Sequence, residues 1–352
     1  MSMNLLSCLV HRRRGSKFIL GILVVAIFWA EWLSYWLQAL TWPNVICKND
    51  DEHCIRILLV ADPQIIGEHF EMGFPVGPLS RWDSDKYLAK TFRLAQTHVR
   101  PHIVIFLGDL MDEGSVSSQT EFLRYYDRFS RIFPSELGVK MLYLPGDNDI
   151  GGENEPITLE KISKFEEKFG QPDVVHYRGI SFIKVNRLQY IIPKLPPQSF
   201  NETRIVLSHL PLLPHPSPFI EHAMTSLKPH LVLSAHEHRA KHTSGTKDGR
   251  RGVTVPLAST LTLQLGGRHN IHELLVPTCS YRMGVPQMGY GALALDTHTM
   301  DANVYLLWLP GRFPQLTGYV ALLCVLFLVS ACLHCSSSLK KRNLHANKHC
   351  QL

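Results

Sequence analysis

The two ends of the chain contain no acidic residue, and the long middle contains no excess of basic residues. Four basic side chains precede the first apolar run and four follow the second (Arg12, Arg13, Arg14, Lys17, Lys340, Lys341, Arg342, Lys348). Removing these eight from the 36 Lys and Arg leaves 28 against 30 Asp and Glu, so residues 18–335 carry a net charge of about −2. A middle part without a basic surplus lacks the electrostatic footprint of a nucleic-acid-binding protein, and we expect no nucleic-acid partner.

Cysteines are scarce in the middle part, and neither an internal repeat nor a low-complexity tract appears. Of eight cysteines, only Cys47, Cys54 and Cys279 lie between the apolar runs. Cys47 and Cys54 could close a small disulfide loop, although their spacing alone does not give their distance in space. Cys332 and Cys335 have the spacing of a metal knuckle, but beside a membrane we expect free or palmitoylated thiols. About 275 residues lie between the apolar runs, enough for one α/β domain with a well-buried core.

Two long apolar runs, Phe18–Leu40 and Leu316–Cys335, approach the ~20 residues that a helix needs to cross a bilayer. A cleaved signal peptide is the alternative for the first run. Its apolar stretch is long for that role and no clean cleavage site follows, so we expect a retained anchor. Glu31 is the one charge in either run. We expect it to face the second helix, or to be tolerated in a Trp-rich segment, rather than to be a functional acid.

The basic residues outside both runs place both tails in the cytosol under the positive-inside rule. The chain then divides into a cytosolic basic tail (1–17), a transmembrane helix (18–40), a juxtamembrane linker (41–54), a lumenal domain (55–310), a second transmembrane helix (316–335) and a cytosolic tail (336–352). Asn201-Glu202-Thr203 is the only glycosylation acceptor pattern, and it fits a lumenal middle part.

The middle part has the pattern of an α/β protein. Helices are predicted at Ser84–Val99, with Ser84 as N-cap, and at Gln119–Ile132, Thr158–Phe169 and Pro218–Leu227. The first two alternate with strands, which predicts a mostly parallel first sheet. Later strands predict a second, mixed or antiparallel sheet packed on the first. These strands are Ile180–Asn186, Arg204–Leu207, Leu231–Leu233, Gly252–Leu257, His272–Val276, Gly291–Asp296 and Asn303–Leu309.

Five short motifs rich in Asp and His occur in order, and runs of β-type residues lead into them. The motifs are Asp62-Pro63-Gln64, Gly108–Asp112, Gly146–Asp149, Ser208-His209 and Ala235–His238. A strand that ends in a carboxylate or imidazole presents it at the carboxyl edge of the sheet, where α/β proteins bind ligands. Three carboxylates and three imidazoles at one edge form a mixed oxygen and nitrogen site, suited to a pair of Mn, Zn or Fe ions.

With these motifs, the chain resembles the calcineurin-like metallophosphoesterases from about Ile55 to Trp308. The resemblance implies a two-sheet α/β metallophosphoesterase sandwich flanked by helices, here with transmembrane helices at the N- and C-terminal ends. It also implies two divalent metal ions, one held by Asp62, Asp109 and His238 and the other by Asp109, Asp147, His209 and His236. Asp109 is the best candidate for the bridging ligand, because the two oxygens of a carboxylate can hold two cations.

Three positions depart from the family pattern. Gln64 stands where the family has His, and we expect it to act as a weak or indirect ligand. Asp147 and Asn148 stand where the family has Asn and His, and that His is the family's candidate for protonating the leaving group. Asn donates a hydrogen bond but cannot act as a general acid. We take Asn148 and Asp149 as catalytic candidates, and expect Asp112 and Asp149 to orient ligands.

The two apolar runs and the stretches Asp147–Gly151 and Pro277–Gly284 resemble a membrane-bound group within the family. That group is implied to remove an ethanolamine-phosphate side branch from the glycan of GPI anchors, with Mn²⁺ as the preferred metal. The implied partners are GPI-anchored proteins or their glycolipid, membrane lipid and transport-cargo machinery. The implied location is ER exit sites, the ER–Golgi intermediate compartment and the cis-Golgi. Arg282 could clamp a phosphate oxygen, with a solvated loop arginine as the alternative.

Two other functions remain open at this point. An anchored phosphatase or nucleotidase acting on a soluble lumenal substrate would use the same ligands. A non-catalytic, metal-bound scaffold or receptor is conceivable because Asn148 replaces the family's histidine. The presence of the other carboxylates and imidazoles argues against a scaffold, which has no need of them.

Overall fold

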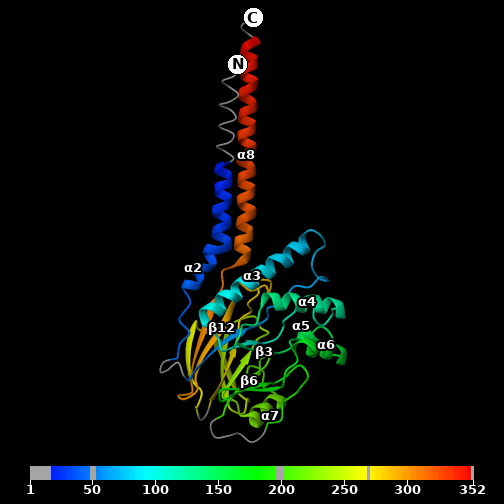
Figure 1. The fold of residues 1–352 in the computed structure, drawn as a ribbon, viewed down its shortest axis with the longest axis vertical. Helices are drawn as coiled ribbons and strands as arrows, with labels where there is room; N and C mark the ends of the chain where they lie inside the picture. The colour runs from blue at the N-terminus through cyan, green and yellow to red at the C-terminus, as the bar shows by residue number, and fades with distance from the viewer. Residues whose placement is uncertain (1–16, 48–52, 196–201, 268–269, 350–352) are drawn as a thin grey trace. The chain divides into compact units, whose positions relative to one another are not determined.

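The computed structural model describes residues 17–47, 53–195, 202–267 and 270–349, with side chains described to Cys332 in the last range. The chain divides into two compact units (Figure 1). One is formed by the two ends, residues 1–37 and 311–352, and the other by residues 38–310. The candidate glycosylation site Asn201 and most of the N-terminal basic tail lie outside the described residues.

The unit formed by the two ends consists of apolar helices. One helix runs from Lys17 to Leu40 and includes a π-helical turn η1 (Trp29–Leu33) before α2 (Ser34–Leu40). The other is α8 (Arg312–His349), which begins four residues before the predicted start at Leu316. Both contain a stretch long and apolar enough to cross a membrane. Glu31 Oε1 accepts hydrogen bonds from Arg312 Nη1 at 2.7 Å and Tyr319 Oη at 3.0 Å, so Glu31 faces the second helix, as predicted.

In the larger unit, the first sheet has the strand order β10-β13-β12-β1-β2-β3. Its bounds are β1 (Cys54–Val60), β2 (Ile103–Phe106), β3 (Lys140–Tyr143), β10 (Thr260–Gln264), β12 (Gly289–Asp296) and β13 (Asp301–Trp308). β1, β2 and β3 are parallel, as predicted, while β12, β13 and β10 extend the sheet antiparallel. The prediction that the last two strands join the second sheet is wrong. β12 pairs with β1, a contact between sequence-distant segments that strand patterns do not specify.

The second sheet is mixed, as predicted, with the order β4-β5-β6-β7-β11-β8-β9. Its bounds are β4 (Val174–Tyr177), β5 (Ile180–Lys184), β6 (Thr203–Leu207), β7 (Leu231–Ser234), β8 (Lys241–Thr246), β9 (Gly252–Pro256) and β11 (Asn270–Leu275). β4, β8 and β10 are not among the predicted strands. Apolar side chains of both sheets form one continuous core, with Leu59 of β1, Leu207 of β6 and Leu233 of β7 among its buried members. The two sheets therefore form a sandwich.

Helices cover both sheets, and local sequence signals place most of them correctly. Their bounds are α3 (Val76–Val99), α4 (Gln119–Ile132), α5 (Asp147–Ile150), α6 (Leu159–Phe169) and α7 (Pro218–Leu227). The predicted start of α3 at Ser84 is wrong, because the helix begins at Val76 and Ser84 is buried inside it. Pro78 lies in the first turn of α3, where proline is tolerated, so it does not mark a helix boundary.

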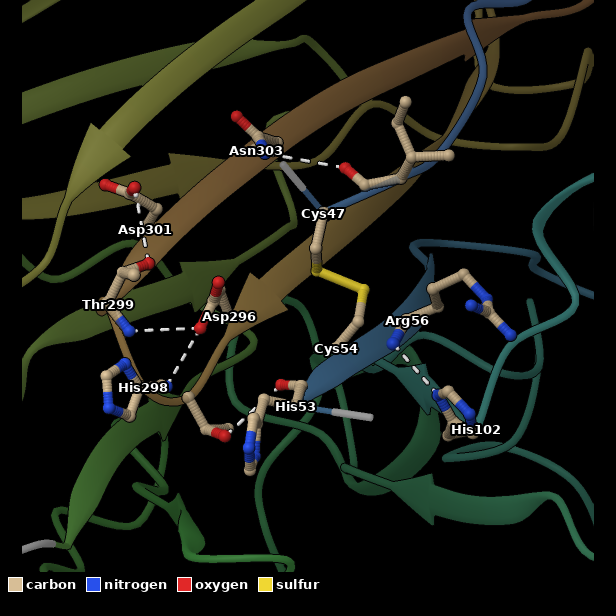
Figure 2. Close-up of a disulfide and its surroundings, with 12 residues drawn as sticks. Cys47, His53, Cys54, Arg56, His102, Asp296, His298, Thr299, Asp301 and Asn303 are labelled. Atoms are coloured by element: carbon tan, nitrogen blue, oxygen red, sulfur yellow. Dashed lines mark hydrogen bonds between the residues drawn. A yellow bond between two sulfur atoms is a disulfide. The ribbon is translucent and has the colours of Figure 1, made fainter. Parts of the chain in front are cut away.

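A disulfide joins Cys47, after the first apolar helix, to Cys54, the first residue of β1 (Figure 2). The Cα atoms of the two cysteines are 5.7 Å apart, so the structure contains the disulfide loop that the sequence left open. The carbonyl of Ile46 also accepts hydrogen bonds from Asn303 Nδ2 at 3.5 Å and Tyr305 Oη at 3.2 Å on β13. The juxtamembrane linker is therefore fastened to β1 and β13 of the first sheet.

Candidate metal centre

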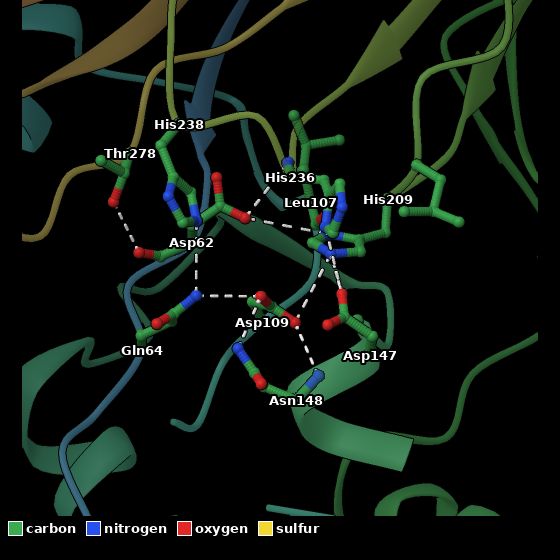
Figure 3. A network of polar contacts seen from close by, with 12 residues as sticks. Asp62, Gln64, Leu107, Asp109, Asp147, Asn148, His209, His236, His238 and Thr278 are labelled. Atoms are coloured by element: carbon green, nitrogen blue, oxygen red, sulfur yellow. Dashed lines mark hydrogen bonds and ion pairs between the residues drawn. The ribbon is translucent and has the colours of Figure 1, made fainter. Parts of the chain in front are cut away.

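The carboxyl ends of strands from both sheets bring the six predicted metal ligands together (Figure 3). They form two groups, Asp109 with Asp147, His209 and His236, and Asp62 with Asp109 and His238. Within each group the candidate ligand atoms all lie within 4.8 Å of one another. Asp109 belongs to both groups, as a bridging ligand would. Metal binding by each of these side chains stays a prediction.

The backbone at this centre adopts left-handed conformations that L-residues rarely take. In the described parts of the chain, ten non-glycine residues have positive φ, and five of them are at the centre. These five are Asp62 (45°), Gln64 (40°), Asp109 (51°), His236 (70°) and His238 (60°). Each such residue costs of order 1–3 kcal/mol and persists only where the surrounding structure holds it. The strain is concentrated where the motifs turn their side chains toward one another.

Asp62 offers a buried carboxylate oxygen that no residue in the described part of the chain satisfies. The side chain is fully buried, and Oδ1 accepts the backbone N–H of His236 at 3.3 Å. Oδ2 has no hydrogen-bond partner among the described residues. A buried carboxylate oxygen without a partner carries a large desolvation penalty, and coordination of a cation would remove it. The donor set around Asp62 therefore fits a divalent cation.

His209 is oriented for coordination through Nε2. Its Nδ1–H donates to the carbonyl of Leu107 at 2.8 Å, which fixes the ring. Nε2 then lies 3.0 Å from Asp147 Oδ1 and 3.4 Å from Asp109 Oδ1. A hydrogen bond that fixes the orientation of an imidazole is typical of metal-ligating histidines. The role of the Leu107 carbonyl could not be identified from sequence, because a backbone oxygen carries no sequence signal.

Two of the three residues that depart from the family pattern, Asn148 and Gln64, hold Asp109. Asn148 donates its backbone N–H to Asp109 Oδ1 and its Nδ2 to Oδ2, each at 3.0 Å. Gln64 Nε2 donates to Asp109 Oδ2 at 2.9 Å and lies 3.4 Å from His238 Nε2. Gln64 thus presents its amide N–H to the cluster. Both residues orient the central carboxylate in this structure.

Asp149 connects two motif loops through backbone hydrogen bonds. Its buried carboxylate accepts the N–H groups of Leu110 at 3.0 Å, Met111 at 3.0 Å and Gly146 at 2.9 Å. These bonds hold the loop after β2 against the start of α5, so the contacts support the orienting role expected for Asp149. A buried carboxylate with three backbone partners is poorly placed to touch a substrate.

The electrostatics of the centre reflect crowded, buried carboxylates. Burial, with the neighbouring Asp109, raises the pKa of Asp62 to about 7. Burial alone would also raise the pKa of Asp147, but hydrogen bonds from His209 and His236 outweigh it and leave that pKa below its ordinary value. Burial lowers the pKa of His209, but the surrounding carboxylates raise it to about 10. These carboxylates hold a proton on Nε2 of His209, and a divalent cation would supply positive charge at the same position.

A cavity of about 250 Å³ adjoins the cluster on the side of Asn148. It is lined by Phe70, Asp112, Ser115, Val116, Asp147, Asn148, Asn154 and Glu155. Among these residues there is no Lys or Arg. Arg282 instead forms an ion pair with Glu71 and does not line the cavity, so its role as a phosphate clamp stays a prediction.

Asp112 is an acid of this cavity that lies close to other acids. Burial, followed by the nearby Glu113, raises the pKa of Asp112 to about 6. Glu155, on the same cavity, lies 3.6 Å from Lys161 Nζ. The cavity is therefore acidic and next to the candidate ligand Asp147.

Comparison with known protein families gives one match that covers more than half of the chain. The family model described as calcineurin-like phosphoesterase matches residues 55–240. The match includes all five motifs and all six candidate ligands.

Among curated proteins, the chain is similar to several named Metallophosphoesterase 1. The one from Ailuropoda melanoleuca is 30% identical over 185 residues, which are 51% of this chain and 45% of that protein. The Metallophosphoesterase 1 homolog of Drosophila melanogaster is 27% identical over 173 residues, 47% of this chain and 45% of that protein. The matched part spans somewhat less than half the length of these relatives.

Several solved structures are similar to this chain at low sequence identity. A dimetal phosphatase from Danio rerio is 13% identical with a TM-score of 0.40, covering 73% of this chain and 99% of that chain. A purple acid phosphatase from yellow lupin (Lupinus luteus) is 11% identical with a TM-score of 0.45, covering 69% of this chain and 50% of that chain.

Proposed function

The chain belongs to the calcineurin-like phosphoesterase family, and on this premise we propose that it is a membrane-anchored dimetal phosphodiesterase that removes an ethanolamine-phosphate side branch from GPI-anchor glycans. The observation that carries the hydrolytic part is the convergence of the six candidate ligands around Asp109. The alternative is a phosphatase or nucleotidase that acts on soluble substrates. The experiment below distinguishes it from the proposed activity.

The residues of the centre would have different roles in phosphodiester hydrolysis. Two divalent ions, when bound, would polarise a phosphoryl oxygen and lower the pKa of a bound water. Asp109 would face both ions, held in position by Asn148 and Gln64. Three carboxylates opposite two dications leave a net charge of +1, which favours a singly charged phosphodiester. Asn148 cannot donate a proton to the leaving group, so the chain supplies no general acid at that position.

The acidic cavity beside Asn148 supports a substrate with a positively charged group. An ammonium bound near Asp112 would find a partly buried carboxylate, while Phe70 on the same wall offers a ring face. The size of about 250 Å³ suits a small alcohol such as ethanolamine rather than a nucleoside and its phosphates. A nucleotide would instead bring negative charge against Asp112 and Glu155, which costs free energy.

The proposal places the larger unit in the lumen of ER–Golgi membranes, with Mn²⁺ as the metal. The disulfide between Cys47 and Cys54 supports an oxidising compartment. Mixed carboxylate and imidazole ligands suit Mn²⁺ as well as Zn²⁺ or Fe²⁺, so Mn²⁺ rests on the resemblance. GPI-anchored proteins would be the substrates, and transport-cargo machinery would be the partner that carries the product onward.

The test uses purified full-length protein with Mn²⁺, a GPI precursor that carries the ethanolamine-phosphate branch, an aryl phosphodiester and a nucleotide. We expect cleavage of the GPI precursor at the highest kcat/KM. Asp112→Asn should raise KM for the precursor and leave KM for the aryl diester unchanged. Glu153→Gln is the matched control, because it removes one negative charge nearby without lining the cavity.

Each outcome of this test has a distinct meaning. Cleavage of the nucleotide in preference to the precursor would replace the proposed substrate. Cleavage of the aryl diester alone would keep the phosphodiesterase and reject the GPI role. Absence of turnover on every substrate, with metal bound, would favour the scaffold.

A further inference from the structure

Six large apolar side chains are exposed in one short segment beside the candidate active-site cavity. They are Phe70, Met72, Phe74, Val76, Leu79 and Trp82, here called the apolar rim. Phe74 is the extreme case, with 90% of its surface exposed. Single exposed apolar residues are common, but a contiguous group of this size indicates an interaction surface. The rim comprises the loop before α3 and the first two turns of that helix.

In this loop the polar and charged groups contact the protein, and the apolar side chains point outward. The fully buried carboxylate of Glu113 accepts the backbone N–H groups of Glu68, His69 and Phe70, each at 2.8 Å. The side chain of Glu71 is only 12% exposed and pairs with Arg282. The charged residues of the loop are thus engaged by the protein. The outward position of the aromatic residues follows from these contacts and not from a lack of structure.

The start of α3 has the same arrangement, with apolar side chains exposed and polar side chains buried. Val76, Leu79 and Trp82 recur every three residues and therefore share one face, which is exposed. The polar residues Asp83 and Ser84 point the other way and are buried, with Asp83 accepting a hydrogen bond from Tyr281 Oη at 2.8 Å. Lys86 Nζ lies 4.3 Å from the centre of the Trp82 ring. A tryptophan beside a lysine on an apolar face is typical of helices at a membrane interface.

Further along, α3 also borders both points at which the chain leaves the larger unit. Tyr87 Oη donates to the carbonyl of Pro310, the last residue of that unit, at 3.1 Å. His98 Nε2 lies 2.9 Å from the carbonyl of Pro43, a few residues after the first apolar helix ends. Trp82 is only five residues from Tyr87, about 7.5 Å along the helix axis. The rim and both connections to the apolar helices therefore adjoin a single helix.

We propose that the apolar rim docks in the headgroup region of the same bilayer that the two apolar helices span. The occupant is lipid because the chain continues directly into membrane-length helices from positions that α3 contacts. Phe70 lines the cavity beside Asn148 as well as belonging to the rim. Docking would hold the mouth of the cavity at the bilayer surface, where a lipid-linked substrate presents its headgroup.

Photo-crosslinking tests this surface without relying on enzymatic activity. Full-length protein carrying p-benzoylphenylalanine in place of Phe74 or Leu79 is reconstituted in phosphatidylcholine vesicles with radiolabelled acyl chains and irradiated. Leu137, fully exposed in the loop between α4 and β3, receives the same probe as the matched control. We expect several-fold more lipid adduct at positions 74 and 79 than at position 137.

Other labelling results would contradict the proposal. Equal lipid labelling at position 137 would show only general proximity and would overturn the proposal. Adducts to a second copy of the chain, or none above background at positions 74 and 79, would assign the rim to a protein partner or to solvent. The experiment measures covalent adducts and not turnover. A negative result would therefore not count against the proposed phosphodiesterase activity.

Discussion

Asp109 combines the central position in the candidate centre with three hydrogen-bond donors that hold its carboxylate. It accepts from the backbone and side chain of Asn148 and from the side chain of Gln64. All three donors point at a carboxylate, whose two oxygens both accept. An amide at position 109 would replace one carboxylate oxygen with an NH₂ group. This donor would then face another hydrogen-bond donor. The chemistry of this residue therefore depends on both its charge and its symmetry.

We expect Asp109→Asn to abolish turnover and to lower metal content at both positions of the cluster. A neutral amide is a poor bridge, and it loses at least one of the three hydrogen bonds that orient the residue. Metal analysis of the purified variant, beside a turnover assay, checks this. The control is Asp296→Asn, which removes another buried carboxylate far along the chain that caps a turn through His298 and Thr299. Two metal equivalents and normal activity in the Asp109 variant would remove it from the bridging role.

Asn148→His restores the imidazole that the family pattern has at this position. We expect kcat/KM for an alkyl phosphodiester to rise by about tenfold relative to an aryl one, since general acid catalysis contributes ~10²–10⁴-fold where it operates. An aryl leaving group needs little protonation. The adjoining cavity of about 250 Å³ offers room for the ring, although the amide bond to Asp109 is lost. An equal change for both diesters would contradict the general-acid explanation and leave Asn148 as a positioning residue for Asp109.

The convergence of the six candidate ligands could be predicted from sequence, while the residues that orient them could not. Ligands at strand ends are specified by the order of the motifs and by the direction of parallel strands. The bonds from Asn148 and Gln64 to Asp109 depend on side-chain rotamers, which spacing does not give. Glu113 was missed although it follows Asp112 directly, because a buried glutamate and a solvated one look the same in sequence.

At the scale of elements, local signals gave correct helices and long-range pairing gave the errors. Ser118 and Thr158 directly precede α4 and α6, and each accepts the backbone N–H three residues later. The start of α3 was misplaced because Ser84, a good capping residue, is used inside the helix. β12 and β13 were assigned to the wrong sheet because pairing with β1 depends on contacts across more than 200 residues. The local propensity of a segment to form a strand does not specify which distant strand it pairs with.

Ser118→Ala tests the capping box of α4. Ser118 Oγ accepts the N–H of Glu121, and the Glu121 carboxylate accepts from the backbone and side chain of Ser118. We expect the free energy of unfolding to fall by about 0.5–2 kcal/mol. Hydrogen bonds from Ser118 lower the pKa of Glu121 from 4.5 to about 2. Because the folded pKa is depressed, the associated stability is present above about pH 4.5 and is lost as the pH falls toward 2.

The variant should therefore also show a shallower loss of stability across that acid range, measured as melting temperature against pH. Thr158→Ala is the matched control, because Thr158 caps Lys161 of α6 at 3.3 Å without a carboxylate in return. It should lower the melting temperature and leave the acid range unchanged. An identical acid profile in both variants would disconnect Glu121 from the capping box.

At the scale of the whole molecule, charge and covalent structure divide the chain in the same way. The basic residues without acidic neighbours lie beyond the two apolar runs, and residues 18–335 carry a net charge of about −2. The disulfide and the hydrogen bond from Tyr305 of β13 to Ile46 fasten the linker directly after the first helix. A bilayer would separate a reducing side with the tails from an oxidising side with the sandwich. That arrangement leads to one prediction about orientation.

We expect both tails to face the cytosol and Asn201 to carry a glycan on the lumenal side. Basic tails are retained on the cytosolic side by the positive-inside rule, and the Cys47–Cys54 disulfide persists only in an oxidising compartment. In sealed microsomes, protease should remove tags from both ends while the larger unit stays protected. Glycosidase should shift the mobility of the natural chain but not of Asn201→Gln, which controls for other modifications. Protected tags would reverse the orientation. One accessible and one protected tag would mean a single crossing, in which case only one of the two apolar helices spans the membrane and the other lies on the same side as the sandwich.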